Sequence, residues 1–235
     1  IAETPSGMLK SIGLANPGVE IFCKDKIPYL NNLQTKVIIN IAGSQIEDYL
    51  ETLKKIEKTN CKHIGYEINI SCPNVKEGGM EFGVSPTVTE KLTSEMRKIT
   101  DKLLIMKLSP NVTDITSIAK AAENGGADAV SAINTVIGMS IDIDTRKSKL
   151  FTNIGGLSGP AIKPIAIANI YKLYKSINIP IIGIGGISSV QDVIEFILAG
   201  AHLVQIGTRN YTNPNAGVEI ANQLSDYCKR NNFKR

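Results

Sequence analysis

The residues of this chain that could carry chemistry stand at the ends of short apolar runs. Cys72 lies in Asn69-Ile70-Ser71-Cys72-Pro73-Asn74, just after one run, and Lys107 ends another, LLIMK. A positioned thiol can take a proton from a substrate, and a lysine can stabilise an anion that develops beside it. Each also has an ordinary explanation, because most thiols are inert and a lysine at a strand end often only extends its charge into water.

The same change from apolar to polar or small residues recurs along the chain. Six apolar runs end in polar or small residues, namely Asn40, Asn69, Lys107, Asn134-Thr135, Gly185-Gly186 and Gly207-Thr208. A single Asn would be explained as a loop cap. In a parallel barrel, however, all the carboxyl ends of the strands lie on one rim, where active sites are built. The repetition therefore predicts a site, and its amides suit a planar ring with both donors and acceptors.

Two glycine-containing segments predict a phosphate site. Gly185-Gly186 and Gly207-Thr208 follow the last two apolar runs, and a helix is expected to start near Ser189. Small residues let backbone N–H groups approach an anion, and the start of a helix adds positive potential. A dinucleotide fingerprint is the alternative, but Gly183-x-Gly185-x-x-Ser188 lacks its third glycine.

Cys72 differs from the other cysteines in its surroundings. Pro73 stiffens the turn, and Gly78-Gly79 gives the segment up to Pro86 a hinge and the length of a lid. Inert thiols are expected at Cys23, Cys61 and Cys228, and structural roles at His63 and His202.

The elements that must position these residues alternate between strand and helix. Strands are predicted at 36–42, 63–71, 103–109, 129–135, 179–185 and 202–207. Their near-continuous apolar character is typical of parallel sheets covered on both faces. Helices are predicted between them, one starting with a capping box of Ser44 and Glu47 and another capped by Ser85.

The fold class that follows is α/β, as a (β/α)8 TIM barrel formed by a single domain over residues 1–235. Only six strand–helix units are found where a closed barrel needs eight, and the first 35 residues are expected to be mostly loop. Either two strands lie upstream of Ile1 or the sheet is open, and the start at Ile without Met favours strands upstream.

Composition excludes several classes of protein. The formal net charge is +4, with basic residues scattered except at the C-terminal tail, which argues against nucleic-acid binding. No apolar stretch is long enough for a membrane span. The four cysteines form no C-x-x-C pair, so neither a metal site nor an iron–sulfur cluster is expected. We expect a cytoplasmic location, with all four cysteines as free thiols.

The ordered motifs closely resemble class 1 dihydroorotate dehydrogenases. The resemblance covers the whole chain through GMLKSIGLANPG, NISCPNVKEGG, KLSPNVTDI, INTVIGM, GGLSGPAIKP, IGIGGISS and QIGTRN. It implies an FMN-dependent barrel that oxidises dihydroorotate to orotate in pyrimidine biosynthesis, with Cys72 as the base. Cys72 is typical of the soluble class, because the membrane-bound class carries Ser there. The loop sequences VKEGGMEFG and KLSPNVTDI resemble those of subclass 1B. This resemblance implies a partner subunit with FAD and an iron–sulfur cluster that passes electrons to NAD.

The resemblance also assigns residues. Contacts to FMN are implied for Asn40, Asn69, Lys107, Ile133, Gly159, Gly185, Gly186, Gly207 and Thr208. Contacts to the substrate are implied for Lys10, Ser11, Ile12, Gly13, Leu14, Asn69, Asn74, Asn134 and Thr135. The implied assembly is a homodimer, or a heterotetramer with the electron-transfer subunit.

One residue departs from the family pattern and keeps other functions open. Lys10 stands where the family usually has Asn, and it could pair with a substrate carboxylate but cannot accept a hydrogen bond. The alternatives are a dihydropyrimidine dehydrogenase of the same barrel type, which Asn74 disfavours, and a flavin-binding homologue without turnover. A barrel lyase or isomerase acting on a sugar phosphate is a third, but it leaves NISCPN without a purpose.

Overall fold

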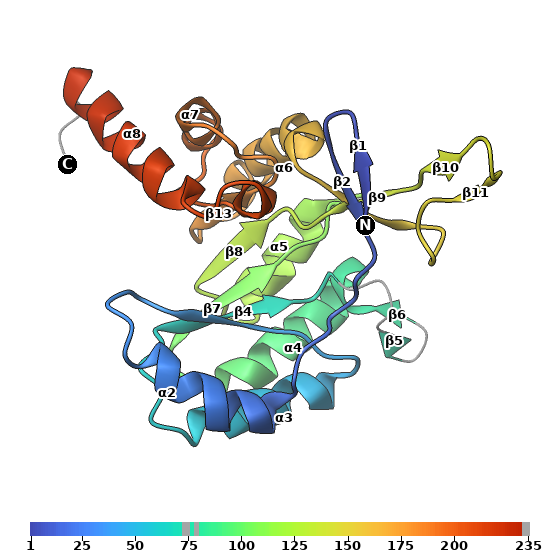
Figure 1. Ribbon diagram of the computed structural model, residues 1–235. Helices are drawn as coiled ribbons and strands as arrows, with labels where there is room; N and C mark the ends of the chain where they lie inside the picture. The colour runs from blue at the N-terminus through green and yellow to red at the C-terminus, as the bar shows by residue number, and fades with distance from the viewer. Residues whose placement is uncertain (72–75, 78–79, 232–235) are drawn as a thin grey trace. The chain divides into compact units, whose positions relative to one another are not determined.

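A computed structural model describes residues 1–71, 76–77 and 80–231 of the chain. It contains two compact units, which are described one at a time. Unit 1 comprises Ile1–Ser11, Ala132–Tyr174 and Ile181–Arg235, and unit 2 comprises Ile12–Ser131 and Lys175–Pro180. Figure 1 shows the course of the chain through both units.

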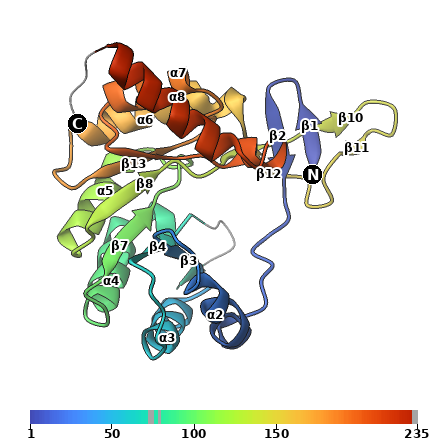
Figure 2. The same cartoon turned by 60° about the vertical axis from the view of Figure 1, so that its left-hand side comes forward.

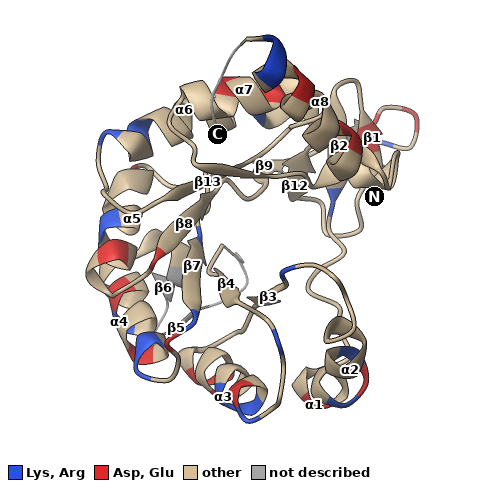
Figure 3. Ribbon diagram, turned by 90° about the vertical axis from the view of Figure 1, so that its left-hand side faces the viewer, with Lys and Arg blue, Asp and Glu red and all other residues tan. Residues whose placement is uncertain are grey.

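Unit 2 is built on a parallel sheet. Its strands are β3 (Ile38–Ile41), β4 (Gly65–Asn69), β7 (Leu103–Lys107) and β8 (Ala129–Ala132), paired in the order β3-β4-β7-β8. The helices α3 (Ile46–Glu57), α4 (Pro86–Arg97) and α5 (Ile115–Asn124) alternate with them and lie along one face (Figure 3). The four predicted strands of this unit are thus confirmed, each shorter than its apolar run.

The core of unit 2 explains why the apolar runs are nearly continuous. Tyr49, Leu53 and Ile56 on α3, with Leu92 and Met96 on α4, are buried. Consecutive residues of β4, β7 and β8 are also buried, so both faces of the sheet are covered. The smaller elements of this unit are α1 (Val19–Ile21), a π-helix (Phe22–Lys26), α2 (Ile27–Leu30), β5 (Lys76–Glu77), β6 (Met80–Glu81) and a 3-10 turn (Phe82–Val84).

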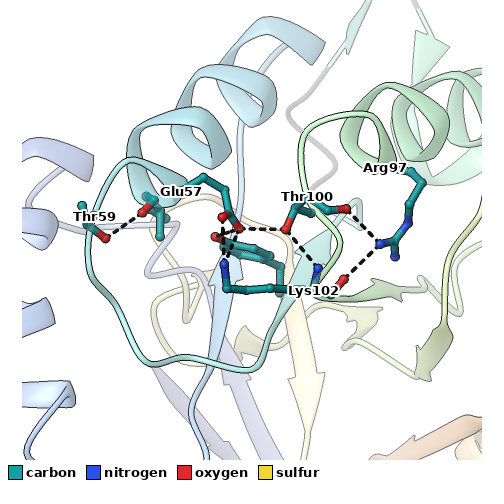
Figure 4. A network of polar contacts seen from close by, with 7 residues as sticks. Glu57, Thr59, Arg97, Thr100 and Lys102 are labelled. Atoms are coloured by element: carbon teal, nitrogen blue, oxygen red, sulfur yellow. Dashed lines mark hydrogen bonds and ion pairs between the residues drawn. The ribbon is translucent and has the colours of Figure 1, made fainter.

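A polar network closes the amino end of this sheet (Figure 4). Glu57, the last residue of α3, accepts hydrogen bonds from Tyr66 and Thr100, both at 2.7 Å, and from Lys102 at 2.8 Å. Burial by itself would raise the pKa of Glu57, but these bonds outweigh it and lower the pKa. Burial lowers the pKa of nearby His63, whose ring meets Tyr66 edge-on with centroids 4.6 Å apart. The network ties the end of α3 to the starts of β4 and β7.

Unit 1 combines a parallel strand pair with an antiparallel sheet. β13 (Ile181–Ile184) pairs in parallel with β14 (Leu203–Gln205), and the helices are α6 (Lys163–Tyr174), α7 (Val190–Leu198) and α8 (Ala216–Arg230). The antiparallel sheet has the order β1-β2-β12-β9, formed by β1 (Ala2–Thr4), β2 (Gly7–Lys10), β12 (Gly155–Ser158) and β9 (Val136–Gly138). A hairpin of β10 (Ile141–Asp142) and β11 (Lys147–Ser148) extends from this unit (Figure 2), and 3-10 turns lie at Pro160–Ile162 and Thr208–Tyr211.

Two sequence predictions about local structure are wrong. The first 35 residues are not mostly loop, because β2 pairs with β12 some 150 residues later, with Gly156 opposite Lys10. A pairing so distant in sequence leaves no local signal. The capping box of α3 is formed by Gln45 and Asp48, not by Ser44 and Glu47, and the backbone N–H of Ser44 also donates to Asp48. The predicted cap at Ser85 is confirmed.

Candidate functional site

A buried carboxylate organises the carboxyl ends of the strands in unit 2. Glu67 on β4 accepts hydrogen bonds from Asn40 Nδ2 at 2.6 Å, Ser131 Oγ at 2.7 Å and Lys107 Nζ at 3.2 Å. The side chain of Glu67 is 8% exposed and that of Lys107 is 15% exposed. A charge buried this deeply is stable only when it is paired and hydrogen-bonded, and here each of four strands contributes one member.

Strand register explains how these side chains meet. Asn40 lies opposite Glu67, Asn69 lies opposite Lys107, and Lys107 lies opposite Ser131. Asn40 and Glu67 therefore share one register position, and Asn69, Lys107 and Ser131 share another that lies two residues nearer the carboxyl ends of the strands. Asn69 and Lys107 end β4 and β7 as predicted, whereas β3 continues one residue past Asn40, to Ile41. Lys107 brings a charge that Glu67 already balances, so the cluster is close to neutral.

Asn69 shapes the chain that follows β4. Its side-chain oxygen accepts hydrogen bonds from Ser71 Oγ at 2.7 Å and Ser71 N at 3.4 Å, and its backbone carbonyl accepts one from Tyr49 at 2.9 Å. The chain returns here after β6, since a Cβ atom on Gly83 would lie 2.6 Å from the carbonyl oxygen of Ile70. Predictions for Cys72, Asn74 and the Gly78-Gly79 hinge concern residues outside the described part.

The glycine segments of unit 1 meet around the start of α6. Gly159 and Gly186 have positive φ angles of 90° and 75°. A Cβ atom on Gly186 would lie 2.8 Å from the carbonyl oxygen of Gly159 and 2.9 Å from the backbone nitrogen of Lys163. A Cβ atom on Gly159 would lie 3.7 Å from Thr208 Cγ2. The positive φ favours glycine at both places, and at Gly186 a side chain would also collide with the backbone of the neighbouring segments.

Asp192 joins the start of α7 to the start of α6. Its Oδ2 accepts hydrogen bonds from Ser188 N and Ser189 N, both at 2.9 Å, and from Ser188 Oγ at 3.0 Å. Its Oδ1 accepts one from Lys163 Nζ at 2.6 Å, and Lys163 also pairs with Glu195 at 3.1 Å. Burial opposes ionisation of Asp192, but these bonds outweigh it and lower its pKa to about 2. Asp192 therefore carries a negative charge at neutral pH.

The remaining predicted residues fall in different parts of the chain. Ile133 is buried and donates its N–H to the carbonyl of Ile184 at 2.7 Å. Asn134 accepts a hydrogen bond from Thr135 N at 2.8 Å. Beside Gly207, the described residues leave the space around a Cβ atom open. Lys10 and Ser11 belong to unit 1, whereas Ile12, Gly13 and Leu14 belong to unit 2.

Sequence reasoning missed Glu67, Ser131, Lys163 and Asp192. Glu67 had a usable signal, since it is the charged residue in the apolar run GYEIN, and a charge within a buried strand needs a partner. Ser131 and Lys163 carried no local signal. Asp192 stands three residues after Ser189 and could have been recognised as its capping partner.

Comparisons with known proteins identify the family of the chain. A model of the family described as dihydroorotate dehydrogenase matches residues 1–227. A Parabacteroides distasonis protein named dihydroorotate dehydrogenase B (NAD(+)), catalytic subunit, is 48% identical over 234 residues, which are 100% of this chain and 76% of that protein. A protein of the same name from Thermoanaerobacter pseudethanolicus is 50% identical over 234 residues, covering 100% of this chain and 77% of its own length.

A solved structure shares the fold. The crystal structure of DHODH in complex with ferulenol from Eimeria tenella matches with a TM-score of 0.76 at 20% identity, covering 97% of this chain and 69% of that one. The likeness supports the predicted α/β TIM-barrel class, to which the parallel strands and alternating helices also conform. Among the described residues, no helix is long and apolar enough to cross a membrane.

Proposed function

The chain belongs to the dihydroorotate dehydrogenase family, and we propose that it is the catalytic subunit of an NAD-linked enzyme of this family. Its reaction is the FMN-dependent oxidation of dihydroorotate to orotate in pyrimidine biosynthesis. The observation that carries the proposal is the cluster of Asn40, Glu67, Lys107 and Ser131 at the carboxyl ends of four strands. It lies where barrel enzymes carry their active sites.

The residues of unit 2 fit the ring of FMN. A flavin ring offers hydrogen-bond donors and acceptors along one edge and gains negative charge when it is reduced. Asn40 and Asn69 can donate and accept, and Lys107 supplies a cation held by Glu67 at 3.2 Å. In this proposal, Glu67 fixes the direction of the Lys107 ammonium. FMN, when bound, would supply the acceptor for a hydride.

The glycine segments of unit 1 fit the phosphate of FMN. At Gly159, Gly185 and Gly186 the backbone closely approaches neighbouring segments. No described heavy atom lies within 4 Å of a Cβ atom on Gly207, which leaves room there for a ligand. Backbone N–H groups can reach an anion only where no side chain intervenes. Thr208 can add a hydroxyl, and Ile133 an apolar contact.

The substrate and the base are assigned by position in the family motifs. We propose that Cys72, as a thiolate, takes a proton from a ring carbon of dihydroorotate while the neighbouring carbon gives up a hydride. Asn69 would hold the substrate and also fixes Ser71, one residue before Cys72. Asn74, Asn134, Thr135 and the segment from Lys10 to Leu14 would complete the substrate site, with Lys10 facing a carboxylate.

Anaerobic flavin reduction by dihydroorotate tests this proposal. In full-length protein, Cys72→Ala should slow reduction by about 10²-fold or more, because a positioned base is lost, while FMN stays bound. Cys61→Ala is the matched control, since Cys61 precedes β4 and Cys72 follows it. Unchanged stopped-flow rates in Cys72→Ala would refute the assignment of the base. Bleaching by dihydrouracil in place of dihydroorotate would refute the substrate.

The relatives' names specify a catalytic subunit, which implies a second subunit. We propose that the partner carries FAD and an iron–sulfur cluster and passes electrons to NAD, and that the chain also forms homodimers. We further propose a cytoplasmic location, which agrees with the free thiols of Cys23, Cys61 and Cys228.

A solvent-facing apolar stripe supports the homodimer. Alternate residues from β9 through β10 to the start of the next turn are at least half exposed, namely Ile137, Met139, Ile141 and Ile143. Such a contiguous stripe is typical of a protein interface. The same hairpin carries acidic residues in its first half (Asp142, Asp144) and basic residues in its second half (Arg146, Lys147, Lys149), so a second copy can match both signs across a two-fold axis.

Sedimentation velocity tests the stripe as the dimer interface. Ile143→Asp should convert the dimer to a monomer without loss of bound flavin, because the charge enters an apolar contact. Leu198→Asp, on an exposed residue of α7, is the control and should remain dimeric. A dimeric Ile143→Asp variant would reject the stripe, and a monomeric wild type would reject the homodimer.

A further inference from the structure

The carboxylate of Asp192 lies at the start of α7. A helix N-terminus is a common place for a phosphate, because its first N–H groups are free to donate. Here the N–H groups of Ser188 and Ser189 both donate to Asp192. Ser188 and Ser189 immediately precede α7, which starts at Val190, so the two donors between the helix and the glycine loop are occupied. The N–H groups around Gly185 and Gly186 and those near Gly207 are the ones we assign to a phosphate here.

Such a phosphate would lie near a buried negative charge. The side chain of Asp192 is 10% exposed, so water screens its charge poorly. Its compensating cation is Lys163, 2.6 Å away and 24% exposed. Lys163 is also the first residue of α6, and its backbone nitrogen borders Gly186. One lysine thus neutralises the carboxylate and sits at the glycine loop.

We propose that Lys163 is a positioning residue for the phosphate of FMN, which it serves by cancelling the charge of Asp192. This inference rests on the proposed FMN site. Lys163 differs in role from Lys107, whose charge would face the flavin ring. Its own bonds to Asp192 and Glu195 direct its ammonium group toward α7. It acts on the ligand through Asp192.

A double-mutant cycle read by flavin affinity tests this role. Full-length apoprotein is titrated with FMN and with riboflavin, which lacks the phosphate, and fluorescence quenching gives each Kd. Lys163→Met should weaken FMN binding by about tenfold or more, because the repulsion from Asp192 is no longer cancelled, and should leave riboflavin binding unchanged. Lys163→Met combined with Asp192→Asn should restore FMN binding, since Asn keeps an oxygen that accepts from Ser188 and Ser189.

The alternative roles of Lys163 give different results. If Lys163 binds the phosphate itself or only supports the fold, the double variant stays as weak as Lys163→Met, and the proposal is overturned. Asp192→Asn alone should keep or strengthen FMN binding, and a fall in affinity would also overturn it, even if Lys163→Met fails to fold. Lys172→Met, an exposed cation on the same helix, is the matched control. A wild-type protein that binds neither flavin would instead reject the proposed FMN site.

Discussion

A glutamate–lysine pair lies at each end of the sheet of unit 2. Glu57 pairs with Lys102 at 2.8 Å, where β4 and β7 begin, and Glu67 pairs with Lys107 at 3.2 Å, where they end. The Glu57 and Lys102 side chains are 21% and 32% exposed, against 8% and 15% for Glu67 and Lys107. The deeper pair has the longer distance, and its further hydrogen-bond partners Asn40 and Ser131 both come from strands. Those of Glu57 are Tyr66 on β4 and Thr100, which precedes β7.

The difference separates a structural pair from a functional one. Glu57 joins elements that would otherwise be tied only through the core, since it links α3 to the residues before β7 (Figure 4). Glu67 joins strands that their own backbone ladder already holds in register. A buried ion pair adds little stability where the sheet is already fixed. We therefore expect the pair at the carboxyl ends to be kept for the chemistry that Lys107 performs there.

The largest expected effect comes from removing each lysine in turn. Lys107→Met should lower the rate of flavin reduction by about 10²-fold, because a cation beside the reduced ring is lost. Lys102→Met changes the same residue type at the other end of β7 and should leave the rate per bound flavin unchanged. Stopped-flow reduction of both variants, normalised to FMN content, checks the comparison. Equal rates in the two variants would remove the functional distinction between the pairs.

A smaller effect is expected on stability. Glu57→Gln should lower the free energy of unfolding by about 1–2 kcal/mol, because hydrogen bonds to a charged acceptor become ordinary ones. The lowered pKa of Glu57 means that its contribution is present above about pH 4.3 and is lost as pH falls through the folded-state pKa. Urea unfolding at pH 7 and at pH 3.5 checks both points. A Glu57→Gln variant as stable as wild type at pH 7 would show that the charge of Glu57 adds nothing to the free energy of unfolding.

Particular residues show how far sequence reasoning reaches. Asn40, Asn69 and Lys107 could be placed at one edge because apolar runs of similar length end at them, and parallel strands align their ends. The β1–β2 hairpin could not be predicted, because its stability comes from pairing with Gly155–Ser158 far along the chain. The capping box of α3 lies one residue later than predicted, because Asp48 and not Glu47 accepts the backbone N–H groups of Ser44 and Gln45.

The sequence by itself determined the alternation of strands and helices, the strand-end polar residues and the family, since periodicity and short motifs are local properties of the chain. Only the tertiary structure decided which charges meet. Glu67 and Lys107 are 40 residues apart, and Lys163 and Asp192 are 29 apart. Pairings at such separations depend on strand register and on how closely glycine lets two segments approach. Neither can be predicted from a short segment of the sequence.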